Sequence, residues 1–317
     1  MKKIMLIVGA LALTTAAIAQ DKKTYKTKFG GEGKRVVLYI GAKSVSVEGY
    51  DGDEVIIEAE NVPQIPKEAE GLRPVGTGGL DNTQIGLSVN IIDNALNITT
   101  VLKGEATYKL RIPRELGLQA KSKNTAYWGE ESPLRVQGLS GNIEIMTNQD
   151  NIELIDVTGP IVANSNQGKI KIVFNEKMSD KPSSISAHGD NIDIAVPETA
   201  AILFSVAARE GNFFTDLDLK PYTAPKKEEK DNWNVVEPAK GTVAAGVGKQ
   251  TNLAQMQADV AQKSKSTTIL SDKYLRGWYS SDDQTPQYVL NEPKTFIKIM
   301  TTNGNVYLRK NNGQKKK

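Results

Sequence analysis

Apolar and polar residues alternate along much of the chain, and the alternation is most regular between residues 139 and 172. Within this stretch an alternating triplet recurs at multiples of nine residues, as Ile143-Glu144-Ile145, Ile152-Glu153-Leu154 and Ile170-Lys171-Ile172. A period of two is typical of a β-strand with one buried face. Each nine-residue unit is therefore predicted to form one short strand.

A longer repeat of eighteen residues contains two of these units. Leu139-Ser140-Gly141 recurs as Val157-Thr158-Gly159, and residues 147–150 recur as residues 165–168. A single strand cannot bury its apolar face alone, so successive coils must stack, with parallel strands about 4.8 Å apart and a shared column of Ile and Leu inside. The predicted fold class is all-β: a right-handed parallel β-solenoid (β-helix) with eighteen-residue coils and flanking strands.

Stacking predicts which charged residues meet on the outer face. Glu153 is expected beside Lys171, and Lys171 beside Asp193, provided that residues 191–194 are a further copy after a four-residue insertion. The signs alternate, and each exposed pair of opposite charges adds a few tenths of a kcal/mol, in order of magnitude.

The corners between strands are rich in Gly, Asn and Asp. We expect these residues to supply the positive φ angles and the side-chain hydrogen bonds that turns need. The eighteen-residue register places Asn148, Asn166 and His188 in one column at a corner.

Alternating segments also flank the repeats. Residues 44–48 and 54–59 are separated by a turn rich in Gly and Asp, and are expected to form an exposed hairpin. Residues 211–214 and 304–308 are similar to degenerate copies of the coil and are expected to continue or cap the stack. Other strands are expected at residues 36–40, 85–89, 95–102, 107–112, 287–290 and 295–301.

The stretch between residues 217 and 285 interrupts this pattern. Residues 220–240 are charged and contain proline, which is typical of an exposed loop. Leu253, Met256 and Val260 lie at helical spacing and predict one short amphipathic helix over residues 252–264.

The first twenty residues have the features of a secretory signal. Lys2 and Lys3 precede an apolar run over residues 4–17, and Ala17-Ile18-Ala19 offers a cleavage site before Gln20. The run is shorter than the roughly 20 residues of a membrane span, so no transmembrane anchor is expected in the mature chain. The expected location is the periplasm or the cell surface of a bacterium.

The predicted organisation is a signal peptide at residues 1–19, an N-terminal extension at 20–33, a solenoid domain at 34–310 and a basic tail at 311–317. Within the domain the repeats are clearest at residues 134–215, and an irregular insertion occupies about 218–285. The chain has no cysteine, hence no disulfide, and its net charge of +3 gives no reason to expect a nucleic-acid partner.

Residues 44–55, the Gly-x-Ile-x-Ile coils and residues 302–310 together resemble the bacterial putative adhesin family, a group of secreted β-solenoid proteins that forms a domain of unknown function. The resemblance covers residues 34–310, and residues 220–284 are the least similar part. It implies an envelope-located, non-enzymatic solenoid with a structural or adhesive role. It supplies no catalytic residues.

The sequence contains few of the motifs that indicate a catalytic site. His188 is the one histidine, and neither a G-x-S-x-G turn nor an HExxH sequence accompanies it. Glu153, Lys171 and Asp193 form a row such as polysaccharide lyases use, but a ladder of opposite charges explains the row more simply. The acidic turn over residues 51–54 is a candidate for a weak cation site, although no metal or other cofactor is expected for the protein.

Four aromatic residues are candidate ligand contacts: Tyr127, Trp128, Trp278 and Tyr279. Exposed, they would stack on sugar rings; otherwise they would cover the ends or edges of the solenoid. The predicted function is thus a secreted structural or adhesive protein without enzymatic activity, whose partner is a cell-surface glycan or an envelope protein. The alternative is a carbohydrate-binding or polysaccharide-processing β-helix protein.

Overall fold

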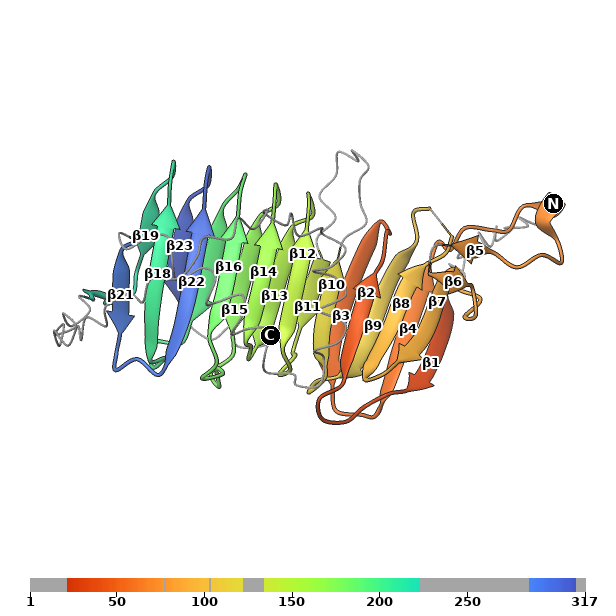
Figure 1. Cartoon of the computed structure of the whole chain (residues 1–317), viewed down its shortest axis with the longest axis horizontal. Helices are drawn as coiled ribbons and strands as arrows, with labels where there is room; N and C mark the ends of the chain where they lie inside the picture. Colours follow the sequence, from red (N-terminus) through yellow and green to blue (C-terminus); the bar gives the residue numbers. More distant parts are fainter. Residues whose placement is uncertain (1–21, 77, 103, 122–133, 223–284, 312–317) are drawn as a thin grey trace, which may run out of the picture.

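A computed structural model describes residues 22–76, 78–102, 104–121, 134–222 and 285–311. In these residues the protein is all-β, and its helical structure is limited to a single 3-10 turn, η1 (Lys67–Ala69). Two large sheets lie face to face along one long axis (Figure 1). A small antiparallel pair, β5 (Val75–Gly76) and β6 (Gly79–Leu80), projects near one end.

We name the two large sheets A and B, and the strands counted in each are those of the described residues. Sheet A has ten strands in the spatial order β1 (Lys23–Lys28), β4 (Glu54–Glu60), β9 (Thr107–Pro113), β3 (Ser44–Tyr50), β11 (Leu134–Gln137), β13 (Ile152–Val157), β15 (Ile170–Phe174), β17 (Ile192–Val196), β23 (Val306–Lys310) and β19 (Phe213–Thr215). Sheet B has eleven, in the order β20 (Lys220–Pro221), β21 (Gln287–Leu290), β18 (Ile202–Ala208), β22 (Thr295–Thr301), β16 (Ser183–Ala187), β14 (Ile161–Ser165), β12 (Ile143–Thr147), β10 (Gly117–Lys121), β2 (Arg35–Tyr39), β8 (Ala95–Thr100) and β7 (Leu87–Ile92).

The chain alternates between the sheets through the middle of the molecule. A strand of sheet B followed along the sequence by a strand of sheet A makes one rung, such as β12/β13 or β14/β15. Successive rungs pair in parallel, with Ile143 opposite Ile161 in sheet B and Ile152 opposite Ile170 in sheet A. The predicted eighteen-residue stacking of parallel strands is confirmed here.

The inward side chains of both sheets form one continuous core. In the strands β12 to β15 and in β17 alternate residues are buried, and Ile145, Leu154 and Ile172 are fully enclosed. Full burial of a side chain of this size contributes about 1.5–3 kcal/mol, so the column of stacked Ile and Leu residues is the main source of stability.

Some corner glycines, such as Gly159, adopt the expected positive φ, whereas others serve a different purpose. Gly141 and Gly168 do not adopt a positive φ; instead, a Cβ atom on Gly168 would lie 2.2 Å from the carbonyl oxygen of Asp150 in the preceding rung. Gly304 meets the backbone of Asp190 in the same way, at 2.1 Å. These positions require glycine because the backbones of adjacent rungs touch. Positive φ is confined in this region to residues such as Gly159, at 86°.

At the C-terminal end the order of rungs in space departs from their order in the sequence. The rung β22/β23 lies between β16/β17 and β18/β19, although both of those precede it in the chain. In sheet A, Val306 of β23 has Ile192 of β17 on one side and Phe213 of β19 on the other. The last segment of the chain is therefore inserted into a stack whose outer rung is formed by earlier residues (Figure 1).

The N-terminal end shows a similar departure. The rung β8/β9 lies outside β2/β3, and β10/β11 then adds to the inner side of β2/β3. The strands β3 and β4 do not form the expected hairpin, because β9 lies between them in sheet A. The segment of residues 23–28 that the sequence assigned to an extension forms β1 and pairs antiparallel with β4.

Candidate functional site

Candidate surfaces on the outer face of sheet A

A row of ion pairs follows the outer face of sheet A across several rungs. Glu153 accepts from Arg135 Nε at 2.7 Å and from Lys171 Nζ at 3.3 Å. Lys171 lies opposite Asp193 in the register of β15 and β17, as predicted. The ion pair of Asp193 is with Arg309 Nε, at 3.0 Å. The ion pairs of Glu153 with Arg135 and Lys171, and that of Asp193 with Arg309, each join neighbouring rungs, so we call the row the ion-pair ladder.

The environment of Glu153 shows how the ladder works. Partial burial on its own would raise the pKa of this carboxyl group, but hydrogen bonds and charge attraction from Arg135 and Lys171 outweigh it and lower the pKa below its ordinary value of 4.5. Glu153 therefore stays ionised near neutral pH and links three successive rungs.

The corner column contains Asn148, Asn166 and His188, as the register predicts. The backbone N–H of Asn166 donates to Thr147 O at 3.3 Å, and that of His188 donates to Ser165 O at 3.1 Å, so the two residues occupy equivalent places. Asn166 also donates to the side-chain oxygen of Asn148 at 3.2 Å. The imidazole of His188 is exposed at this corner.

The acidic turn after β3 does not form a cluster of converging carboxylates. Asp51 pairs with Arg114 through Nε and Nη2, so its charge is compensated by the residue that follows β9 (Thr107–Pro113). Among the residues that the structure describes, no group of three or more His, Cys, Asp or Glu side chains is placed to hold a metal ion.

At the C-terminal end of sheet A, aromatic side chains take the outward positions that charged side chains hold in the ion-pair ladder. Tyr307 lies opposite Asp193 on one side and opposite Phe214 on the other. The two rings are stacked, with centroids 5.5 Å apart and planes inclined by 13°, and the Arg309 guanidinium lies 5.2 Å from the centre of the Tyr307 ring. Phe214 is 50% exposed, so this aromatic pair presents an apolar flat surface to solvent.

Sequence reasoning did not single out this pair. A signal was present, because Phe214 and Tyr307 occupy the outward position of the degenerate Gly-x-apolar-x copies, the place that Glu153 and Lys171 hold in the regular coils. The aromatic residues that the sequence did single out, Tyr127, Trp128, Trp278 and Tyr279, lie outside the described residues.

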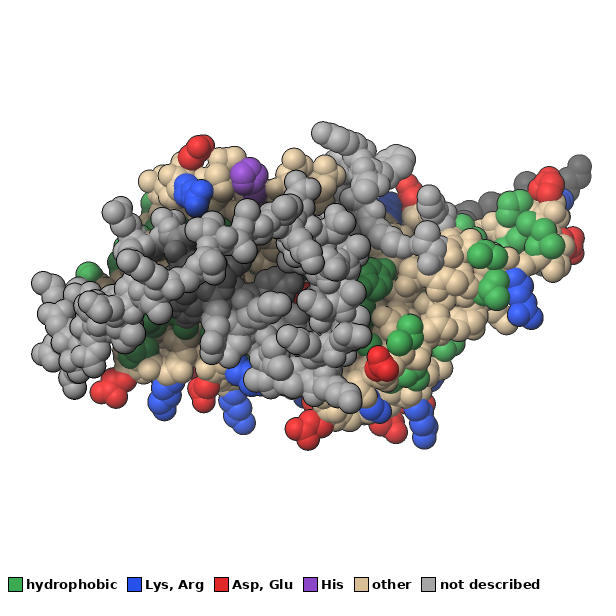
Figure 2. Space-filling view, viewed as in Figure 1, with side chains coloured by type: hydrophobic (Ala, Val, Ile, Leu, Met, Phe, Trp, Pro, Cys, Tyr) green, Lys and Arg blue, Asp and Glu red, His purple; other side chains and the backbone are tan. Residues whose placement is uncertain are grey.

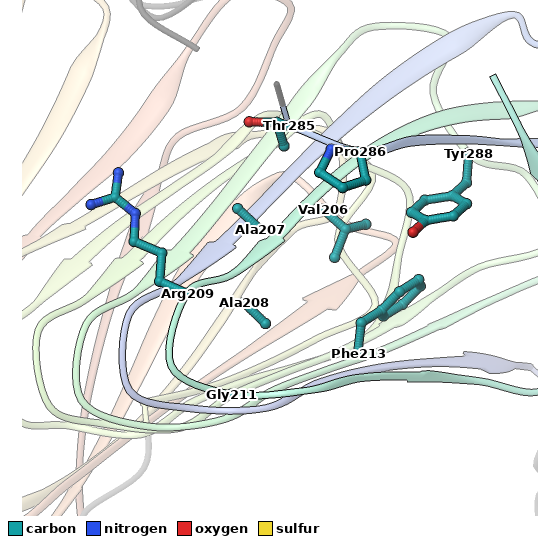
Figure 3. A pocket seen from close by; sticks show the side chains of 9 residues that line it. All are labelled: Val206, Ala207, Ala208, Arg209, Gly211, Phe213, Thr285, Pro286 and Tyr288. Atoms are coloured by element: carbon teal, nitrogen blue, oxygen red, sulfur yellow. The ribbon is translucent and has the colours of Figure 1, made fainter. Parts of the chain in front are cut away.

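A shallow cavity lies between the sheets at the same end, where β18 and β19 diverge (Figure 3). Its described lining includes Val206, Phe213 and Tyr288, and the rings of Phe213 and Tyr288 are 5.4 Å apart. Arg209 is the one charged side chain in that lining. The cavity is thus the open end of the core rather than a pocket with convergent polar groups.

Exposed apolar side chains also gather at the opposite, N-terminal end, around β5 and β6 (Figure 2). The largest exposures are those of Val75, Leu72 and Ile92, at 73%, 66% and 61%.

Within the described ranges, no helix has the length and apolar character needed to cross a membrane. The predicted signal over residues 1–19 and the predicted helix over residues 252–264 lie outside those ranges.

Comparison with known proteins gives two distant similarities. No family model and no curated protein matches the chain. A solved structure described as "a putative cell adhesion protein" from Clostridium sporogenes aligns over 91% of this chain and 99% of its own, with 8% identity and a TM-score of 0.40. A second, described as a "putative adhesin" from Parabacteroides distasonis, covers 62% of this chain and 90% of its own, with 13% identity and a TM-score of 0.21. At these values neither similarity supports an argument about the role of this chain.

Proposed function

We propose that this is a secreted, non-enzymatic protein of the bacterial envelope, with a structural or adhesive role, and that its stack is a right-handed β-solenoid. The observation that carries the proposal is the ion-pair ladder of sheet A. Side chains that could otherwise act on a substrate, such as Glu153 and Asp193, are held by cations of neighbouring rungs. The right hand is the one that nearly all parallel strand–crossover–strand connections adopt.

The shape of the molecule supports the same role. Eight stacked rungs, about 4.8 Å apart, make a rod that is stiffened by two hydrogen-bonded sheets and one continuous core. Such a rod can hold its two ends apart and present an extended, regular surface. The resemblance of the sequence to the putative adhesin family agrees with an adhesive use of that surface.

Deletion of the gene in the producing bacterium tests this proposal. We expect the loss of attachment to host cells or abiotic surfaces, restored by the native gene, and a secreted chain that begins at Gln20 when its N-terminus is sequenced. Substitution of Asp193 by Asn should leave attachment unchanged, because the proposal gives this carboxylate no chemical step. Unaltered attachment in the deletion strain would argue against an adhesive role, and a cytoplasmic, uncleaved chain would exclude the envelope.

The aromatic pair favours a second candidate function, binding of a glycan. Sugar rings stack on exposed aromatic faces, and Arg309 and Asp193 lie beside the pair with groups that can hydrogen-bond hydroxyls. On a glycan array, Phe214→Ala should abolish binding, whereas Trp128→Ala and Trp278→Ala test two of the four sequence-based candidates. Phe296→Ala, in sheet B, is a matched control. No binding by the native chain would exclude this candidate.

A polysaccharide-processing activity makes a separate prediction. His188→Ala or Asp193→Ala would abolish depolymerisation of an envelope or host polysaccharide and leave the circular dichroism spectrum unchanged. If the native protein releases no reducing ends or unsaturated products from a panel of such polysaccharides, the catalytic alternative fails and the non-enzymatic proposal stands.

A further inference from the structure

The C-terminal edge of sheet A is open among the described strands. β19 pairs with β23 on one side, and no described strand pairs with its other side. Sheet B differs at this end, because β21 and β20 continue beyond β18, and β20 ends on Pro221, which has no N–H to donate. An unpaired strand edge presents backbone donors and acceptors that can receive another strand.

The side chains of β19 also leave room for a further strand. Phe214 stacks on Tyr307 with one ring face and is half exposed. Phe213 points toward the cavity between the sheets (Figure 3). A strand added beside β19 would therefore place an outward side chain against Phe214 and an inward side chain over the open end of the core.

The other edge of sheet A is β1, at the opposite end of the molecule (Figure 1). β1 is antiparallel to β4, and β4 is antiparallel to β9, so β1 runs in the same direction as β9 and as the strands of the rungs. If a second copy is translated along the long axis of the stack without rotation, its β1 therefore runs parallel to β19 of the first copy. All neighbouring strands of sheet A from β9 to β19 are also parallel to each other.

The charges of the two edges are complementary. Residues 22–28 contain four lysines and no carboxylate, while residues 210–218 contain Glu210, Asp216 and Asp218 and no Lys or Arg. Lysines along an edge strand oppose its pairing with another copy of itself. The same lysines attract an acidic edge, which selects contact between unlike ends.

We infer that the protein associates head to tail with a second copy of itself, with β19 of one molecule pairing in parallel with β1 of the next. A register that keeps the inward faces aligned places Tyr25 beside Phe213, Lys26 beside Phe214 and Lys28 beside Asp216. The Lys26 ammonium then lies against an aromatic ring, a favourable contact.

The contact joins two different surfaces, so it does not close on itself and its repetition builds an open filament. Strand addition at one edge buries little area, so the association is expected to be weak and to appear at high protein concentration and low salt. The inference goes beyond the proposed envelope role and does not depend on glycan binding.

Sedimentation velocity of residues 20–317 at about 100 µM tests the inference, with ionic strengths of about 0.02 M and 0.3 M to vary the screening of charge. We expect dimers and longer species at low salt, and their decrease at high salt. Glu210→Lys with Asp218→Lys, or Lys23→Glu with Lys26→Glu, should each weaken association by about ten-fold or more. Asp216 is kept, because its carboxylate accepts the backbone N–H of Lys310 at 2.8 Å.

Mixing the two charge-reversed variants gives the sharpest result. Each variant keeps one native end, so the native β19 of the Lys23→Glu/Lys26→Glu variant can pair with the native β1 of the Glu210→Lys/Asp218→Lys variant. The mixture should therefore form heterodimers more strongly than either variant associates alone. Circular dichroism of each variant controls for folding. Because the chain has no cysteine, a mixture of Phe214→Cys and Lys26→Cys should also form a disulfide-linked heterodimer under mild oxidation.

Three outcomes would overturn the inference. The native chain could stay monomeric at low salt; the association could be indifferent to both pairs of charge reversals; or the mixture could fail to associate. If the native chain is monomeric and the β19 amides that point away from β23 are nevertheless protected from exchange, another segment of the same chain occupies this edge instead.

Discussion

The middle and the C-terminal end of the stack are built from the same rung but assembled in different ways. In the middle, β12/β13 is followed by β14/β15 both along the chain and in space. At the C-terminal end, β22/β23 enters between two rungs that precede it in the sequence. Rungs in the middle depend on their sequence neighbours, whereas the outer rung β18/β19 depends on the last segment of the chain. The local repeat thus determines the structure of each rung. The order of the rungs at the ends of the stack is determined by segments that are distant in the sequence.

Removal of residues 285–317 is expected to have the largest effect, and to destabilise the C-terminal end of the stack far more than the middle. The truncation deletes β21, β22 and β23, which are the partners of β18 and β19. By hydrogen exchange, we expect the amides of β18 and β19 to exchange at least about 100-fold faster, while β12 to β15 keep most of their protection.

Truncation after residue 311 is the control for that experiment, because it leaves every described strand intact. Retained protection of β18 and β19 in the longer truncation would mean that these strands find partners directly on β16 and β17.

Alanine at the corner glycines is expected to have the next largest effect. In Gly168→Ala the new methyl group would meet the carbonyl of Asp150, and in Gly304→Ala that of Asp190. Each substitution should lower the free energy of unfolding by about 3 kcal/mol, measured by urea denaturation, because the backbones of two rungs must separate.

Gly189→Ala is the matched substitution at the same corner. A Cβ atom there would lie 3.3 Å from the nearest atom, and the equivalent places in other rungs hold Gln149 and Gln167. We expect a loss within about 1 kcal/mol. If Gly168→Ala and Gly189→Ala lowered the free energy of unfolding equally, close contact between the backbones of adjacent rungs would not explain why residue 168 is glycine.

The smallest expected effect concerns the ion-pair ladder. Because the pKa of Glu153 is lowered in the folded protein, its contribution to stability is present above the ordinary value of 4.5 and is lost as the pH falls through the folded value. Glu153→Gln should cost about 0.5–1 kcal/mol at pH 7, and the difference from the native chain should shrink below pH 4.5.

Glu144→Gln, at an outward position one strand earlier, serves as the control for the loss of a carboxylate from the outer face of a rung. A Glu153→Gln difference that persists unchanged at acidic pH would indicate a packing effect instead of an electrostatic one.

The sequence was sufficient for the regular part of this fold. An eighteen-residue period places Ile152 beside Ile170 and Glu153 beside Lys171, because consecutive copies must share one buried column and one outer face. The same reasoning put Asn166 and His188 at one corner, and the backbone contacts agree.

Periodicity could not supply the order of the terminal rungs. The copies at residues 211–214 and 304–308 fit equally well beside residues 191–194, and the choice between them depends on tertiary packing at long range. The reason for glycine at Gly168 was also hidden, since turn chemistry and contact between neighbouring backbones favour the same residue. The stacked pair Phe214 and Tyr307 was not predicted, because both residues lie in degenerate copies of the repeat, at positions that hold charged residues in the regular coils.

The most direct test of the inserted rung uses engineered cysteines in this cysteine-free chain. Adjacent strands lie about 4.8 Å apart and strands two apart about twice that, so a disulfide can join only the former. Asp193→Cys with Tyr307→Cys should therefore cross-link within one molecule, and Asp193→Cys with Phe214→Cys should not. Cross-linking of the second pair without the first would place β19 directly on β17 and contradict the account.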